Sequence, residues 1–185
     1  MKGLQSASAL LSESFRALKK TRVLVFCALM LALQVVLGNV TSIQLGPTLR
    51  ISFQYLASAA TGLLLGPVPA LLTAALADLV GFMIRPMGSY FFGFTLSAAV
   101  SGLIYGLFFY CREVKLWRVL LAKLLVTVLV YAILNTLWLQ MLYGDSFMVL
   151  LPTRLLKNLI QFPVDAILLY PLMKILSREK KRLGL

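Results

Sequence analysis

The chain has 185 residues and a formal net charge of +12, with 61% hydrophobic and only 13% charged residues. Soluble proteins average about 45–50% apolar and about 25% charged residues, so this composition excludes a soluble domain. The sequence lacks histidine, and Cys27 and Cys111 lie far apart in apolar segments, so zinc sites, histidine triads and disulfide frameworks lack their parts. We therefore expect an integral membrane protein that is not an enzyme and that uses no metal, cofactor or nucleic acid.

Residues 1–22 precede the first apolar run. Leu4, Leu11, Phe15 and Leu18 recur at helical spacing beside basic residues, which favours a short amphipathic helix at the cytoplasmic membrane surface. A solvated, frayed segment is the alternative. No small-residue cleavage site follows the apolar run, so we do not expect a signal peptide.

The apolar runs that follow predict an all-α membrane protein with six transmembrane helices in a compact bundle, because a span needs about 20 apolar residues. The first span begins at residue 23 and ends at Gly38-Asn39. The others are expected over residues 51–65, 69–84, 93–110, 116–142 and 152–175, with Pro152 as the first residue of the sixth helix. Residues 23–176 then form a single membrane domain, and residues 177–185 form a basic tail.

The basic residues orient this bundle. Fourteen of the 18 lie in the N-terminal segment, in the region from the end of the fourth span to Lys123, and at the C-terminal end. Six spans place these three regions on one side of the membrane. Because Lys and Arg concentrate on the cytoplasmic side, we expect both termini in the cytoplasm.

Four basic residues remain at the outer ends of the spans: Arg50, Arg85, Arg154 and Lys157. Four cations near one opening would attract an anionic ligand, and the guanidinium fork binds carboxylates well. The alternative is that these side chains reach lipid phosphates at the interface.

The sixth span carries a polar stripe. Its members lie at offsets 0, 3, 4, 7 and 11 on one helical face: Arg154, Lys157, Asn158, Gln161 and Asp165. Lipid does not tolerate such a face, so the stripe is expected to line the bundle interior or a water-filled cavity. The cations lie at the outer end and Asp165 lies deeper, which predicts a pocket that opens outwards.

The fifth span offers a matching face with Tyr131, Asn135 and Trp138 at offsets 0, 4 and 7. Aromatic rings and an amide opposite a cationic opening suit a flat heterocycle with an acidic tail, although Trp138 could instead be an interface anchor. Asp78, near the middle of the third span, is costly there unless paired, and we expect a structural role for it in preference to a place in the pocket.

Small residues recur four positions apart in three spans. For Gly62 with Gly66, and for Gly102 with Gly106, we expect packing within the bundle. The Ala28-x-x-x-Ala32 pair has bulky apolar neighbours on all sides, so it could form a notch that receives another membrane protein. The sequence has no phosphate-binding Gly-x-x-x-x-Gly-Lys-Ser/Thr loop, so energy for uphill transport would come from elsewhere.

Residues 49–56, 88–97, 135–139 and 151–158, together with Ala28-x-x-x-Ala32, resemble the substrate-binding S components of energy-coupling-factor (ECF) vitamin transporters, and most closely the folate-specific members. The resemblance covers nearly the whole chain. It implies a prokaryotic cell-membrane protein that captures folate from outside and docks through its first span onto an EcfT-type coupling subunit with two ATPases. It also implies that the protein topples within the membrane.

The resulting hypothesis assigns Ala28 and Ala32 to partner docking. It assigns eleven residues to the substrate, with Asp165 or Asn135 reading the pterin ring: Arg50, Gln54, Arg85, Tyr90, Asn135, Trp138, Arg154, Lys157, Asn158, Gln161 and Asp165.

Other interpretations remain open from the sequence. The ligand could be another vitamin such as pantothenate, which carries one carboxylate, whereas a cationic thiamine precursor fits the basic opening poorly. A secondary transporter of an organic anion is a further alternative. A membrane enzyme acting on lipid head groups would need clustered acids or a nucleophile–base pair, and a scaffold without a ligand would not need the polar stripe.

Overall fold

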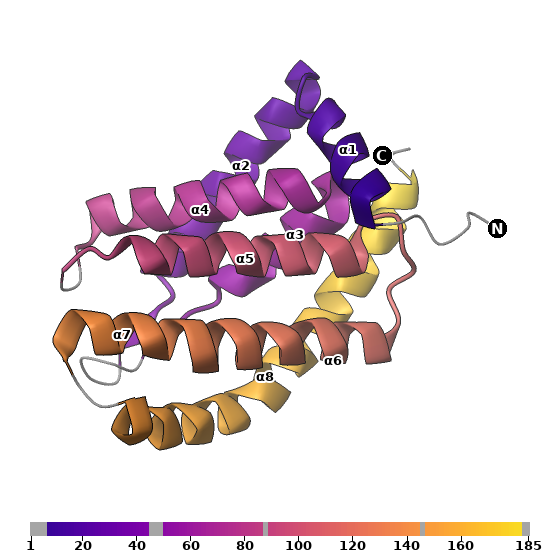
Figure 1. The fold of residues 1–185 in the computed structure, drawn as a ribbon. Coiled ribbons are helices and arrows are strands. Elements are labelled where there is room, and N and C mark those ends of the chain that lie inside the picture. The colour runs from indigo at the N-terminus through magenta and orange to yellow at the C-terminus, as the bar shows by residue number, and fades with distance from the viewer. Residues whose placement is uncertain (1–6, 45–49, 87–88, 145–146, 183–185) are drawn as a thin grey trace.

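The computed structural model describes residues 7–44, 50–86, 89–144 and 147–182, although some side chains within these ranges, Arg50 among them, lie outside the description. The described chain is a bundle of helices with one short β-hairpin (Figure 1). The elements in chain order are α1 (Ala7–Ala17), α2 (Thr21–Asn39), β1 (Ile43–Gln44), β2 (Arg50–Ile51), α3 (Gln54–Leu65), α4 (Pro67–Ile84), α5 (Phe92–Phe109), α6 (Leu116–Leu125), the π-helix η1 (Val126–Leu134), α7 (Asn135–Tyr143) and α8 (Phe147–Arg182).

Five helical segments of the described chain are long and apolar enough to cross a membrane: α2, α4, α5, the continuous helix Leu116–Leu142, and Arg154–Lys180 within α8. Helix α3 has only 12 residues and is therefore about 18 Å long, shorter than the hydrocarbon core of about 30 Å. The second span expected over residues 51–65 starts late because Arg50 and Ile51 pair with Gln44 and Ile43 in the hairpin.

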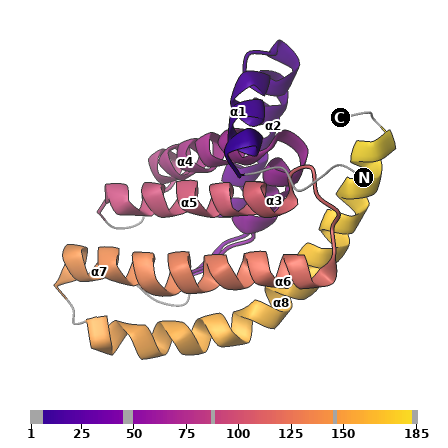
Figure 2. The ribbon, with the colours of Figure 1, turned by 45° about the vertical axis from the view of Figure 1, so that its right-hand side comes forward.

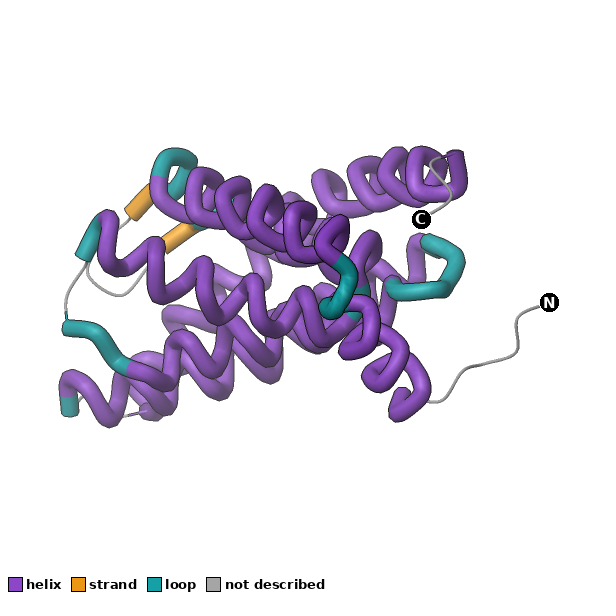
Figure 3. Tube along the Cα trace, turned by 90° about the horizontal axis from the view of Figure 1, so that it is seen from above, coloured by secondary structure: helices purple, strands orange, loops and turns teal. Residues whose placement is uncertain are grey.

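Successive helices alternate in direction when the short α3 is counted between α2 and α4. At one end of the bundle, Asn39 Nδ2 at the end of α2 donates to the carbonyl of Gly81 near the end of α4, at 3.3 Å. At the other end, Lys180 Nζ of α8 donates to the carbonyls of Leu63 and Leu64 at 2.7 and 3.3 Å. The hairpin lies at the first of these ends (Figure 3).

Helix α8 differs most from the helix expected in its place. It begins at Phe147 and continues to Arg182, so Pro152 lies inside it and the prediction that Pro152 is its first residue is wrong. Pro163 and Pro171 also lie inside α8, and each removes a backbone donor, which bends a helix. Figure 2 shows the curve: the first half of α8 runs beside α7, and the second half crosses to α3 and α6.

The glycine pairs bring helix backbones into direct contact, as the sequence predicted. A Cβ on Gly102 would lie 2.4 Å from the carbonyl oxygen of Ala70, and one on Gly106 would lie 2.2 Å from Cα of Pro67. A Cβ on Gly62 would lie 2.7 Å from the backbone nitrogen of Gly106. Helices α3, α4 and α5 therefore form one tightly packed unit.

Helix α2 joins this unit through its C-terminal part. Its buried residues are Gln34, Val35 and Gly38. Nε2 of Gln34 donates to the hydroxyl oxygens of Thr61 on α3 and Thr73 on α4, each at 3.3 Å. The N-terminal part of α2 projects from the bundle (Figure 1). Helix α1 packs against the start of α4, where the backbone nitrogen of Val68 donates to Ser14 Oγ at 3.4 Å.

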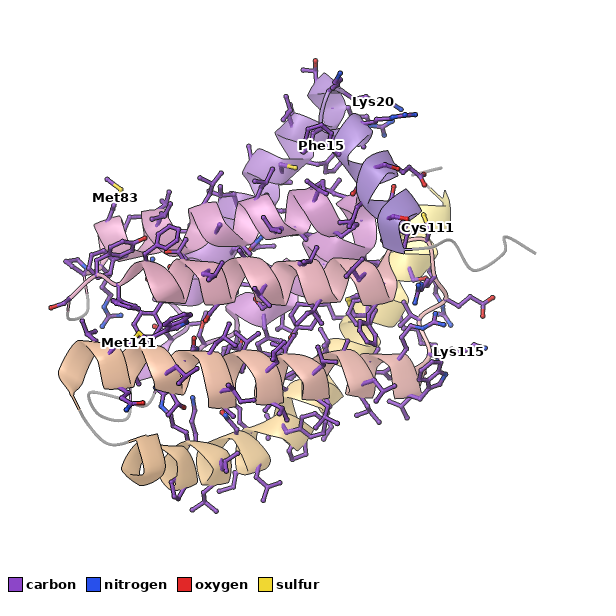
Figure 4. All side chains as sticks on the ribbon, in the orientation of Figure 1. Phe15, Lys20, Met83, Cys111, Lys115 and Met141 are labelled. Carbon is purple, nitrogen blue, oxygen red and sulfur yellow. The ribbon has the colours of Figure 1, made fainter. Side chains whose placement is uncertain are left out.

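The apolar core fills one half of the bundle. It combines residues of α3, α5, the continuous 116–143 helix and the second half of α8: Tyr55, Ala59, Leu63, Ile104, Tyr105, Phe109, Val119, Ala122, Val126, Val130, Leu169 and Met173. Figure 4 helps to locate the two ends: Met83 and Met141 mark the hairpin end, and Cys111 and Lys115 mark the opposite end. The half nearer the hairpin end contains a cavity instead.

Candidate functional site

The cavity has a volume of about 350 Å³, within the range of about 300–1,000 Å³ typical of small-molecule sites. Residues of α2, α3, α4, α5, η1, α7 and α8 line it, so every long helix contributes. Tyr55 and Val130 belong both to its wall and to the apolar core, and they mark the floor where the two meet.

Three of the four cations singled out from the sequence line this cavity: Arg85, Arg154 and Lys157. Arg85 follows the end of α4 and is exposed, and its Nη1 donates to the carbonyl of Asn39 at 3.2 Å. Arg154 and Lys157 are half-buried on α8. Positive charge therefore enters the cavity from two helices, with Arg85 after the end of α4 and Arg154 and Lys157 on α8. The side chain of Arg50, the fourth predicted cation, lies outside the described residues.

The predicted amide side chains also reach the cavity, with Gln54 on α3, Asn135 on α7, and Asn158 and Gln161 on α8. Asn135 Oδ1, Asn158 Nδ2 and Gln161 Oε1 are buried and have no hydrogen-bond partner among the described residues. Buried polar atoms are normally paired, so these acceptors and this donor are available to a polar ligand.

Aromatic rings cover the wall formed by α4 and α5. Phe82 and Tyr90 lie 5.1 Å apart between ring centroids, and both line the cavity together with Phe91 and Phe94. Tyr131, on η1, lines the opposite side. Flat apolar faces on two sides suit an aromatic heterocycle.

Trp138, which the sequence assigns to the substrate, lies behind this wall and is not among the residues that line the cavity. Its Nε1 donates to Ser97 Oγ at 3.0 Å, and its ring lies 5.7 Å from that of Phe91. A Cβ on Gly93 would lie 2.4 Å from the indole, so α5 has room for Trp138 only because a glycine stands there. Trp138 supports Phe91 and Ser97, which line the cavity.

Asp165, the other residue predicted to contact the pterin ring, is not among the residues that line the cavity. Its Oδ2 lies 2.7 Å from Nζ of Lys123, and the two side chains are 4% and 1% exposed. Lys123 is thus a buried residue, not part of the cytoplasmic charge that the sequence suggested. The signal that could have identified the pair is the presence of one acid and one base within adjacent spans, because intramembrane charges usually pair.

Asp78 was expected to have a structural role, and it also lines the cavity. Its Oδ2 accepts a hydrogen bond from Thr95 Oγ1 at 2.8 Å, and Tyr90 Oη lies 2.8 Å from the same hydroxyl. Because Thr95 gives its proton to Asp78, Tyr90 donates to Thr95. This chain of hydrogen bonds joins α4 to α5 and fixes an aromatic ring of the cavity.

Ala28 and Ala32, the predicted docking residues, are both exposed on the projecting part of α2. Leu24, Val25, Leu29 and Leu33 around them are also exposed, by 42–64%. A small-residue notch between apolar side chains therefore stands clear of the bundle.

Comparison with known proteins relates this chain to the S components of ECF-type transporters. Residues 18–178 match the family model described as ECF-type riboflavin transporter, S component. The folate transporter FolT of Clostridium novyi (strain NT) is 45% identical over 161 residues, which cover 87% of this chain and 93% of that protein. FolT of Leuconostoc mesenteroides subsp. mesenteroides is 33% identical over 172 residues, covering 88% and 91%.

A solved structure of FolT bound with folic acid shares 39% sequence identity with this chain and superposes with a TM-score of 0.76, covering 82% of this chain and 91% of that one. This agreement confirms the resemblance inferred from the sequence motifs. The chain belongs to the family of S components of ECF-type transporters and is a relative of the folate transporters FolT.

Proposed function

We propose that this protein is the membrane-embedded S component that captures folate and delivers it inwards together with a coupling subunit and ATPases. The main observation behind this proposal is the cavity, which combines three cations with aromatic walls. It also contains buried amide atoms that have no hydrogen-bond partner among the described residues. The folate-bound structure of a 39% identical relative supports the choice of ligand.

The charge distribution suggests how folate lies. Arg85, Arg154 and Lys157 suit the two carboxylates of the glutamate tail, because charge-assisted hydrogen bonds to carboxylates are the strongest that proteins form. The pterin ring then reaches the floor, where Asn135 and Gln161 offer acceptors. Phe91, Phe94 and Tyr131 would contact the flat faces of the molecule.

The cationic lining favours folate over other vitamins. The matching family model is described for riboflavin, which carries no carboxylate and so could not form carboxylate hydrogen bonds with the cations that line the cavity. Pantothenate has one carboxylate and no aromatic ring, so it would use the cations but not the aromatic walls. Of these three vitamins, only folate has both carboxylates for the cations and an aromatic ring for the aromatic walls.

The proposed topology has six membrane crossings and both termini in the cytoplasm. The alternating directions of the helices support it, since the ends of α3 and α8 meet through Lys180 and Leu63. In this arrangement α3 and the β-hairpin together provide the second crossing, which the 12 residues of α3 do not span alone. The cavity then faces outwards.

The proposed partners are an EcfT-type coupling subunit and two ATPase subunits. The exposed notch at Ala28 and Ala32 supports α2 as the docking helix, because small residues let helix backbones approach closely in lipid. The sequence itself contains no phosphate-binding loop, so ATP hydrolysis is assigned to the partners.

The test is folic acid binding to the purified chain in detergent, measured by isothermal titration calorimetry. We expect saturable binding that riboflavin and pantothenate do not displace. Arg154→Ala and Lys157→Ala should each weaken binding roughly 10- to 100-fold, the effect of losing one charged hydrogen bond. The exposed Lys115→Ala is the matched control. Absence of folate binding by folded wild-type protein would refute the proposal.

A further inference from the structure

The ion pair between Lys123 and Asp165 lies directly behind the cavity floor. It joins the continuous 116–143 helix to α8, and Nζ to Oδ2 is 2.7 Å. Nζ also lies 3.8 Å from the ring centroid of Tyr55 and 5.4 Å from that of Tyr131, and both rings line the cavity. The ammonium is thus surrounded by the carboxylate and two aromatic faces that form the floor.

Asp165 has a second partner on its own helix. Gln161, one turn earlier, donates from Nε2 to Oδ2 at 3.2 Å and to Oδ1 at 3.5 Å. An ionised carboxylate only accepts hydrogen bonds, so it requires the NH₂ group of the amide on its side. The carbonyl oxygen Oε1 of Gln161 must then point the other way.

Oε1 of Gln161 is buried and has no hydrogen-bond partner within the described chain, and Gln161 lines the cavity. The Gln161 amide therefore presents a hydrogen-bond acceptor, its carbonyl oxygen, to a ligand in the cavity. An amide in place of Asp165 could donate or accept, and an aliphatic side chain could do neither, so in both cases the Gln161 amide would lose its preference for one orientation. The charged carboxylate of Asp165 permits only the orientation of the Gln161 amide in which the NH₂ group faces Asp165.

We propose that Lys123 and Asp165 are positioning residues which fix the Gln161 amide so that its carbonyl selects a ligand carrying an N–H at the contacted position, namely N3–H of the pterin ring. This inference rests on the proposed binding of folate with its ring at the floor. Lys123 compensates the buried negative charge, because an unpaired carboxylate is expensive in this environment. The specificity comes from Gln161, and the two charged residues act through it.

The chemistry gives a specific probe. Folic acid carries a 4-oxo group and a hydrogen on N3. Aminopterin differs only by a 4-amino group, which leaves N3 with a lone pair and no hydrogen. An acceptor fixed opposite N3 attracts the first compound and repels the second. A buried donor–acceptor mismatch of this kind is expected to lower affinity by about tenfold or more.

The experiment measures dissociation constants for folic acid and aminopterin with the full chain in detergent. Wild type should prefer folic acid about tenfold or more. Gln161→Met, which removes the acceptor, and the double variant Lys123→Met with Asp165→Leu, which removes both charges together, should bring the two constants within about twofold of each other. Lys123→Arg, which keeps the ion pair, should retain the preference.

The matched control removes the surface ion pair between Lys115 and Glu113, whose side chains are 58% and 77% exposed, through Lys115→Met with Glu113→Gln. It should retain the wild-type ratio. A purely structural role of the buried pair would weaken both ligands equally and leave the ratio unchanged, and that result would overturn the inference.

Two further results, loss of folic acid binding by the wild type and failure of a variant to fold, are interpreted separately. Wild-type protein that does not bind folic acid refutes the proposed function itself. If the apolar double variant does not fold, the polar and uncharged variant Lys123→Gln with Asp165→Asn replaces it. This variant permits both amide orientations, so an unchanged ratio in it equally overturns the inference, and a reduced ratio supports it.

Discussion

Nε2 of Gln34 on α2 lies 3.3 Å from the hydroxyl oxygen of Thr73 on α4, in a helix with half of its other residues exposed. The same nitrogen donates to Thr61 on α3. This polar contact among three helices attaches α2 to the bundle near one end and leaves Ala28 and Ala32 accessible.

Replacing Gln34 with Ala should therefore loosen α2. The change removes two hydrogen bonds and leaves a buried gap, which together cost about 2–4 kcal/mol of unfolding free energy. Thermal unfolding of the ligand-free protein in detergent measures the effect. Val36→Ala, at a half-exposed position two residues later, is the control and should change stability little. Equal melting temperatures for the two variants would contradict the anchoring role.

A bulky residue in the α2 notch should separate ligand binding from transport. Ala32→Trp adds a large side chain at an exposed position that does not line the cavity, so we expect unchanged folic acid affinity. Assembly with the coupling subunit should fall at least tenfold, because the helix backbones no longer approach closely. Co-purification and cellular folate uptake provide the readout. Leu33→Trp, at the neighbouring exposed position, should retain assembly if the notch is the contact.

The hydrogen-bond chain from Tyr90 through Thr95 to Asp78 should act as one unit. Tyr90→Phe and Thr95→Val each break the chain, so each should weaken folic acid binding by about 3- to 10-fold. The double variant should be no weaker than the worse single variant, because residues of one network are not additive. A double-mutant cycle on the dissociation constants tests this, and fully additive losses would show that the two side chains act separately.

A methyl group between α4 and α5 should be poorly tolerated. Gly106→Ala places a Cβ 2.2 Å from Cα of Pro67, and backbone atoms cannot move aside as a side chain does. We expect a loss of about 1–3 kcal/mol or more in stability, or failure to fold. Gly81→Ala is the matched control, since its Cβ meets only the Asn39 side chain at 3.3 Å. Detergent melting curves of both variants compare the two sites.

The sequence predicted the family and the helical bundle, because these follow from hydropathy, helical periodicity and recognisable motifs. Eight of the eleven residues assigned to the substrate line the cavity, which has 29 lining residues in the described chain. Periodicity identifies the face of a helix but not the depth at which the face leaves the cavity. Asp165 shares the face of Arg154, yet it follows the bend at Pro163 and lies beyond the floor beside Lys123. The role of Trp138 depends on space left by Gly93, which no local pattern reveals.

The sequence predicted the bounds of the helices less well than the helix faces that line the cavity. Helix α3 lost its first residues to the hairpin pair of Gln44 and Arg50, a contact across a loop that hydropathy does not detect. Helix α8 begins five residues before Pro152, so Pro152 lies beyond the first turn, the position where proline is normally tolerated. The difference at α3 comes from an interaction outside the apolar run itself.

The contact between Lys180 and Leu63 also bears on how the protein is made. It joins positions 117 residues apart, so α8, which is synthesised after the other described helices, provides the donor for carbonyls at the end of α3. Contacts of such long sequence separation are slow to form. Closure of this end of the bundle therefore depends on the synthesis of α8, and the earlier helices lack this contact until α8 enters the bilayer.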